Sequence, residues 1–161
     1  TGAVGREVAR LGRAIGMRVI AWTFHPAGNA AEWVELDEVF RQADVVSLHV
    51  PLTDATRHLI DARALAAMRP SAVLVNVARG PVVDERALVA ALRAGTIAGA
   101  GLDVFEREPE VEEGLLSLEN VVMTPHLGSA TRATRVAMGM LCVDALRAVL
   151  LERRRPANAV G

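Results

Sequence analysis

Three polar residues with the chemistry to handle a small acid each follow an apolar stretch of this chain: Arg79, Glu108 and His126. An arginine is a permanently charged, forked donor that suits a carboxylate. A histidine can give or take a proton near neutral pH, and a glutamate beside it would orient the ring and favour its charged form. Together, such side chains could bind a small 2-keto or 2-hydroxy acid and move a proton to or from its oxygen.

Each of the three residues also has an ordinary structural explanation when it is taken alone. An arginine after a strand is commonly a surface residue, a glutamate before a proline is commonly solvated, and a histidine after a proline is commonly a cap or a core residue. Glu106 is a second carboxylate that competes with Glu108 for the same role. The functional interpretation therefore depends on the three residues occurring together, in order, after successive predicted strands.

The elements that would position these residues alternate along the chain. Val4, Val8, Leu11 and Ile15 recur at helical spacing, and Gly16 is a plausible helix stop. Helices alternating with continuously apolar strands predict an α/β fold with a doubly wound parallel sheet, Rossmann-like, in which ligands bind beyond the carboxyl ends of the strands. The further helices are predicted over residues 36–42, 62–68, 87–94 and 131–154, and the strands over 19–22, 45–48, 72–77, 97–104 and 121–123.

The chain begins inside a glycine turn, Gly2-Ala3-Val4-Gly5, that precedes the first predicted helix. A dinucleotide fingerprint places three glycines between a strand and a helix. If Gly2 and Gly5 are the second and third of these, the first glycine and the strand before it are missing, and Thr1 fills the variable position. The fold is therefore predicted to be truncated before its first strand, which would leave neighbouring strands without a partner.

Several motifs in order resemble the cofactor-binding domain of the D-isomer-specific 2-hydroxyacid dehydrogenases. The resemblance implies that residues 1–161 are a cofactor-binding domain fragment, in which 131–161 form a C-terminal helix and tail that would return to an absent substrate domain. It also implies an NAD(P)-dependent oxidoreductase acting on a small 2-keto or D-2-hydroxy acid, and a homodimer in the full-length protein. The motifs are the glycine turn and residues 48–53, 73–80, 83–85, 98–109 and 121–129.

The resemblance assigns roles to single residues. His126 would be the catalytic proton donor, Glu108 its partner and Arg79 the ligand of the substrate carboxylate, while Asp103 would contact the nicotinamide carboxamide. His49 and His58 are expected to be structural, and no metal site is expected. The cofactor would be bound by the backbone around Gly2, Ala3, Val4 and Gly5 at a helix N-terminus, and by Thr23, Pro51, Val77, Ala78, Arg79, Asp103, His126, Gly128 and Ser129.

Thr23 leaves the choice of cofactor open. An acidic residue at the end of the second strand commonly binds the adenosine ribose and repels a 2'-phosphate. Threonine removes that repulsion, yet no arginine follows between Phe24 and Glu35, and His25 is a modest substitute. Both NAD and NADP therefore stay possible.

The motifs around residues 109–116 and 128–140 are most similar to bacterial glyoxylate and hydroxypyruvate reductases, so the expected substrate is glyoxylate or hydroxypyruvate. Two alternatives stay open: a 3-phosphoglycerate dehydrogenase, and a dinucleotide-sensing, corepressor-like binding protein on the same fold. As an isolated fragment, the chain is expected to lack activity.

Composition excludes other classes of function. A length of 161 residues with 52% hydrophobic and 23% charged residues suits one globular domain with a core. A net charge of -1 offers no basic field for nucleic acid, and no apolar run approaches the roughly 18 residues that cross a bilayer. The single cysteine, Cys142, excludes a disulfide within these residues and suits a reducing cytoplasm. We therefore expect a cytoplasmic protein that binds neither nucleic acid nor membrane.

Overall fold

The computed structural model describes residues 2–26 and 28–159. They form an α/β, Rossmann-like structure in two compact units, Thr1–Pro125 and His126–Gly161. Each unit is described by itself. The position that the fingerprint assigns to Thr1 lies outside the described residues.

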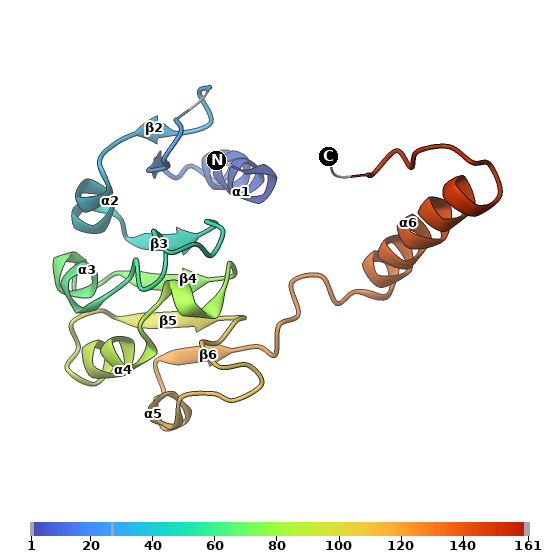
Figure 1. Ribbon diagram of the computed structural model, residues 1–161. Coiled ribbons are helices and arrows are strands. Elements are labelled where there is room, and N and C mark those ends of the chain that lie inside the picture. The colour runs from blue at the N-terminus through green and yellow to red at the C-terminus, as the bar shows by residue number, and fades with distance from the viewer. Residues whose placement is uncertain (1, 27, 160–161) are drawn as a thin grey trace. The chain divides into compact units, whose positions relative to one another are not determined.

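A parallel sheet of four strands forms the centre of the first unit, in the order β3-β4-β5-β6 (Figure 1). Val45 pairs with Val73 in the next strand, and Val73 pairs with Gly99. Because every neighbour is parallel, all four carboxyl ends lie at one edge of the sheet. The strands are β3 (Val45–Leu48), β4 (Val73–Asn76), β5 (Gly99–Leu102) and β6 (Val121–Met123).

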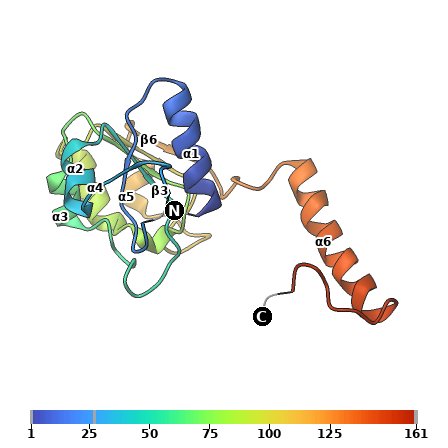
Figure 2. The same cartoon turned by 90° about the horizontal axis from the view of Figure 1, so that it is seen from above.

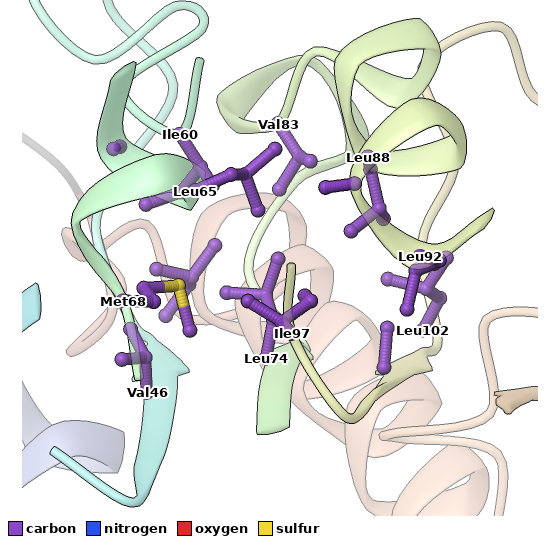
Figure 3. Close-up of a cluster of buried hydrophobic side chains, with 14 of the residues drawn as sticks. Val46, Ile60, Leu65, Met68, Leu74, Val83, Leu88, Leu92, Ile97 and Leu102 are labelled. Atoms are coloured by element: carbon purple, nitrogen blue, oxygen red, sulfur yellow. The ribbon is translucent and has the colours of Figure 1, made fainter. Parts of the chain in front are cut away.

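Helices α2, α3 and α4 lie together on one face of this sheet, whereas α1 lies beyond β3, near β1 and β2 (Figures 1 and 2). Leu65 of α3, Leu88 of α4 and Leu74 of β4 are almost fully buried in one apolar cluster between helices and sheet (Figure 3). The helices are α1 (Ala3–Ala14), α2 (Leu36–Gln42), α3 (Ala62–Ala67), α4 (Glu85–Arg93) and the short α5 (Glu113–Leu116), with a 3-10 turn η1 at Gly80–Val82.

The sheet is interrupted between β1 (Ile20–Ala21) and β3. In the described residues, β1 pairs only with β2 (Glu32–Trp33), and these two strands form a separate parallel pair. A hollow of about 660 Å³ lies between the two sheets and is lined by side chains such as Val8, Ile20 and Val46. The predicted gap is therefore present beside β1. It separates β1 from β3, and the facing edges of these two strands do not pair with each other.

The second unit contains one helix among its described residues, α6 (Arg132–Leu150). Its N-cap is Thr131, whose hydroxyl accepts a hydrogen bond from the Thr134 N–H. Apolar side chains of α6 such as Val136, Val143 and Leu146 are exposed. Among all described helices, none has the length and apolar character needed to cross a bilayer.

The boundaries show where sequence periodicity is a weak guide. The last helix ends at Leu150, four residues before the predicted end, because the chain turns at 151–154 and Arg153 takes a positive φ of 50°. The strand predicted over 97–104 is shorter, and the helix predicted from residue 87 begins at Glu85, after the cap Asp84. Three elements, β2, α5 and η1, were not predicted, because each is too short to show a period.

Candidate active site at the carboxyl edge of the sheet

The predicted site residues of the first unit follow the carboxyl ends of adjacent strands. Leu48, Asn76 and Leu102 are register partners at the ends of β3, β4 and β5. Pro51, Arg79 and the segment that begins at Asp103 come directly after these strand ends along the chain. The parallel register therefore brings predicted site residues that are widely separated in sequence to a common edge.

Asn76 organises the turn that carries Arg79. Its side-chain oxygen accepts a hydrogen bond from the Ala78 N–H at 3.1 Å, and its amide nitrogen donates to the Arg79 carbonyl at 3.1 Å. Asn76 is 1% exposed, so both bonds are shielded from water. The Arg79 side chain is exposed and donates from Nη1 to the Ala78 carbonyl. The turn is held rigidly while its guanidinium stays at the surface.

Gly80 joins this turn to the loop that carries Glu108. A Cβ atom at Gly80 would lie 1.8 Å from the Phe105 carbonyl oxygen, so the two backbones touch and only glycine fits. In the same loop, the Phe105 N–H donates to Oε1 of Glu108 at 3.0 Å. Arg79 and Glu108 therefore belong to two segments in direct contact.

Asp103 is buried at the end of β5, with 8% of its surface exposed. Its carboxylate accepts a hydrogen bond from the Thr124 hydroxyl, and its N–H donates to the Asn76 carbonyl. This partner lowers the cost of burying the carboxylate. Burial alone thus does not require a ligand at Asp103, and a role toward the nicotinamide rests on its position at the edge.

The predicted pyrophosphate site lies at the first turn of α1. Gly2 is its N-cap, and the Arg6 N–H is bonded to the Gly2 carbonyl, so the amides of the residues between them have no helical acceptor. That turn contains no acidic residue, and the Cβ position of Gly2 has open space around it. These features fit an anionic group of a dinucleotide. Gly2, Gly5 and Thr23 also line the hollow between the two sheets.

His126 is the first residue of the second unit, whereas Arg79 and Glu108 belong to the first. It takes a positive φ of 55°, and the turn after it is closed by a bond from the Ala130 N–H to the Leu127 carbonyl. Gly128 and Ser129 lie in this turn. The pairing of Glu108 with His126 stays a prediction.

Sequence reasoning missed the residues that shape the site without touching a substrate. Asn76 could have been noticed as a polar residue that ends an apolar run, since a buried amide must be hydrogen-bonded. Gly80 follows Arg79 directly, but no local pattern shows that its backbone meets Phe105. His49, expected to be structural, lies 3.0 Å from the Ser47 hydroxyl, and burial lowers the pKa of its ring. In the described residues, no cluster of three possible metal ligands is found.

A parallel, doubly wound sheet with a glycine-turn helix and charged residues at its carboxyl edge defines the class of dinucleotide-binding α/β proteins. Comparison with known families specifies the class further. Residues 1–128 match the family described as D-isomer specific 2-hydroxyacid dehydrogenase, NAD binding domain. The chain belongs to this family.

Similar proteins span a greater length than this chain. Glyoxylate reductase from Thermococcus onnurineus is 50% identical over 145 residues, 87% of this chain and 43% of that protein. A solved structure from Thermus thermophilus has a TM-score of 0.94 and 46% identity, over 99% of this chain and 51% of that one. The structure of an NADPH-dependent glyoxylate/hydroxypyruvate reductase from Sinorhizobium meliloti, solved with NADP and malonate, has a TM-score of 0.88 and 40% identity, over 99% of this chain and 53% of that one. The chain spans about half the length of these relatives.

Proposed function

We propose that the chain is the cofactor-binding part of an NAD(P)-dependent reductase that converts a small 2-keto acid, glyoxylate or hydroxypyruvate, into its D-2-hydroxy acid. The observation that carries the proposal is the contact between Gly80 and Phe105, which joins the segments of Arg79 and Glu108 at the carboxyl edge of a sheet of this family. The names of the relatives support the same reaction.

Each of the three polar residues has a role in this proposal. Arg79 holds the substrate carboxylate and keto oxygen through its planar, forked donors. His126 gives a proton to the keto oxygen as it becomes a hydroxyl, and Glu108 orients the imidazole and stabilises its charged form. A bound nicotinamide supplies the hydride. The rigid turn at Asn76 would lower the entropic cost of holding Arg79 in place.

The cofactor would bind along the same edge. The first-turn amides of α1, from Ala3 to Gly5, would face the pyrophosphate, and Thr23 would lie near the adenosine ribose. Pro51, Val77, Ala78 and Asp103 would line the nicotinamide half, together with Gly128 and Ser129. A threonine at residue 23 is compatible with either NADH or NADPH, and the NADP-bound relative supports the second as strongly as the family name supports the first.

The quaternary arrangement is part of the same proposal. The exposed apolar side chains of α6 need a covering partner, and we infer that this helix packs against a substrate domain or a second subunit in a cytoplasmic homodimer. Light scattering on the protein as its gene encodes it, including whatever flanks this chain, tests the dimer. A monomer at micromolar concentration would contradict it.

The test of function is oxidation of NADH and NADPH by that protein with glyoxylate, hydroxypyruvate and phosphohydroxypyruvate. We expect turnover with one of the first two. Turnover only with phosphohydroxypyruvate would point to a phosphoglycerate dehydrogenase, and cofactor binding without turnover would point to a sensing protein. The isolated chain is expected to turn over nothing.

Two variants connect turnover to the residues. Arg79→Lys keeps the charge but loses the fork, so we expect kcat/KM for the keto acid to fall by about 100-fold, the scale of a lost bidentate contact to a reacting group. Arg93→Lys is the matched control, because Arg93 is exposed at the C-terminal end of α4 and does not line the hollow between the two sheets. Equal losses in the two variants would contradict the role of Arg79.

A further inference from the structure

A cluster of three titratable side chains lies beside the proposed reacting groups: His58, Glu85 and Glu106. Nε2 of His58 lies 2.7 Å from Oε1 of Glu106. The Glu106 N–H donates to Oε1 of Glu85 at 2.7 Å, and the Glu85 N–H donates to Oε2 of Glu106 at 3.4 Å. Each glutamate thus binds the backbone of the other, and His58 holds the remaining oxygen of Glu106. We call these three residues the brace.

The brace connects the two segments that carry Arg79 and Glu108. The His58 N–H donates to the Pro81 carbonyl at 2.8 Å, in the turn that follows Arg79. Glu106 lies two residues before Glu108 in the same loop. One end of the brace is therefore fixed to the Arg79 segment, and the other end to the loop of Glu108.

Each carboxylate of the brace depends on the hydrogen-bond donors that face it. An ionised carboxylate only accepts hydrogen bonds, so the contact with an ionised Glu106 requires the tautomer of His58 that has a proton on Nε2. Glu85 is 4% exposed, and burial raises the pKa of its carboxyl, an effect that the Glu106 N–H partly offsets. A buried carboxyl is costly unless it accepts such bonds. Removing a donor from Glu85 or from Glu106 would therefore disturb the Phe105–Glu108 loop.

The two glutamates of this loop have different surroundings. Glu106 is bound by His58 and by the backbone of Glu85. Glu108 accepts the N–H of Phe105 from its own loop and is exposed. The carboxylate that competes with Glu108 in the sequence is thus tied into the fold, and its neighbour Phe105 links it to Glu108.

We propose that His58 and Glu106 are positioning residues, which fix the Phe105–Glu108 loop against the Arg79 turn so that Glu108 is held in its working place. This inference rests on the proposed function for its catalytic consequence. His58, which was expected to be a structural residue, thereby has a role in positioning Glu108. The contacts that support this role all lie within the first unit.

Three variants of the protein as its gene encodes it test the proposal. His58 has a positive φ of 50°, so His58→Asn keeps a residue that tolerates this backbone but cannot reach Glu106. Glu106→Ala removes the carboxylate, and Glu106→Gln keeps one acceptor oxygen for the Glu85 N–H while its NH2 group can donate to Nε2 of the neutral His58 ring. Glu112→Gln is the matched control, because it breaks an ion pair between the partly buried Glu112 and Arg107 of the same loop and leaves the hydrogen bonds of His58 and Glu106 in place.

Two readouts are measured on each variant, together with its melting temperature. We expect the Phe105 and Glu106 amides to exchange hydrogen about tenfold faster in His58→Asn and Glu106→Ala. We expect kcat to fall about tenfold while KM for the nicotinamide stays within about twofold, because a loosened loop misplaces Glu108 but not the cofactor. The double variant that combines His58→Asn with Glu106→Ala should have a kcat no lower than that of either single variant, because both changes break the same contact. Glu106→Gln should recover most of the kcat of the unaltered protein.

The outcomes separate this inference from the proposed function. If the unaltered protein turns over no keto acid, the proposed function fails, and the amide exchange rates alone decide whether the brace holds the loop. If turnover is present, and both the amide rates and kcat in His58→Asn match those of Glu112→Gln, the positioning role is overturned. A lower melting temperature with unchanged kcat would overturn it as well, because it would leave His58 only a structural role.

Discussion

At the scale of single residues, the site depends on one close approach of two backbones. Gly80→Ala would place a Cβ atom 1.8 Å from the Phe105 carbonyl oxygen, so one of the two segments must move. We expect a loss of stability of about 1–3 kcal/mol, typical of overpacking, and a loss of turnover. Gly101→Ala in β5 is the control, since a Cβ atom at Gly101 would lie 3.9 Å from its nearest neighbour, Cγ2 of Val75. Chemical unfolding of both variants measures the difference, and equal stability would contradict the close contact.

A second residue links the fold to pH. Burial lowers the pKa of His49 from its ordinary value of 6.5, so the folded protein favours the neutral ring. A lowered pKa contributes stability above 6.5, and that contribution is lost as pH falls through the folded value. The melting temperature should therefore drop more between pH 7.5 and 5 in the unaltered protein than in His49→Gln. His25→Gln, at an exposed histidine, should leave the drop as it is, and identical slopes in all three proteins would refute the prediction.

The residue scale also shows how far the sequence alone can predict the site. Arg79 and Glu108 could be selected in advance, because charged residues after apolar runs point to the carboxyl edge of a parallel sheet. The roles of Asn76 and Gly80 depend on partners that only folding brings near, at Arg79 and Phe105. The sequence likewise contains both Glu106 and His58, 48 positions apart, and no periodicity relates them. Contacts between distant segments were therefore not predicted, whereas the positions of Arg79 and Glu108 after the ends of their strands were; the catalytic roles of both residues stay predictions.

At the scale of elements, a side-chain cap holds the start of α3 but not the start of α2. The Asp61 carboxylate accepts the Ala64 N–H at 2.8 Å at the start of α3, whereas Glu35, the cap residue of α2, makes no side-chain cap bond. Asp61→Ala should cost about 1 kcal/mol of unfolding free energy, and Asp61→Asn, which keeps an acceptor, much less. Glu35→Ala should have almost no effect. A similar loss in Glu35→Ala and Asp61→Ala, measured by urea unfolding, would show that the cap bond is not the cause.

The predicted helices and the strands of the four-stranded sheet were mostly confirmed, because the helices show a helical period of apolar residues and the strands are continuous apolar runs. The exception is β2, because its partner β1 lies within the strand predicted over residues 19–22. β2 has two residues, which is too short to show a period, and Glu32 would not be assigned to a strand from its own preference. The pair forms because Ile20 and Glu32 meet across a loop, a contact set by tertiary structure.

At the scale of the whole molecule, the interrupted sheet predicts uneven stability. β4 is paired along both edges, whereas β1 pairs with β2 alone among the strands of the described residues and faces the hollow on its other side. Val4 and Ile15 of the adjacent α1 are exposed within the first unit, so this part of the fold buries little apolar surface. Opening of residues 20–33 should therefore cost much less free energy than opening of residues 73–102.

Hydrogen exchange of the isolated chain tests this division. We expect the amides of residues 20–33 to exchange at least about a hundredfold faster than those of residues 73–102. Because a ligand stabilises only the states that bind it, added NADH or NADPH should slow exchange at residues 3–23 more than at residues 89–93, the C-terminal half of α4. Equal protection of both segments would mean that the two sheets open together as one cooperative unit. Slower exchange at residues 20–33 only when the cofactor is present would show that the nucleotide itself orders the glycine-turn half of the fold.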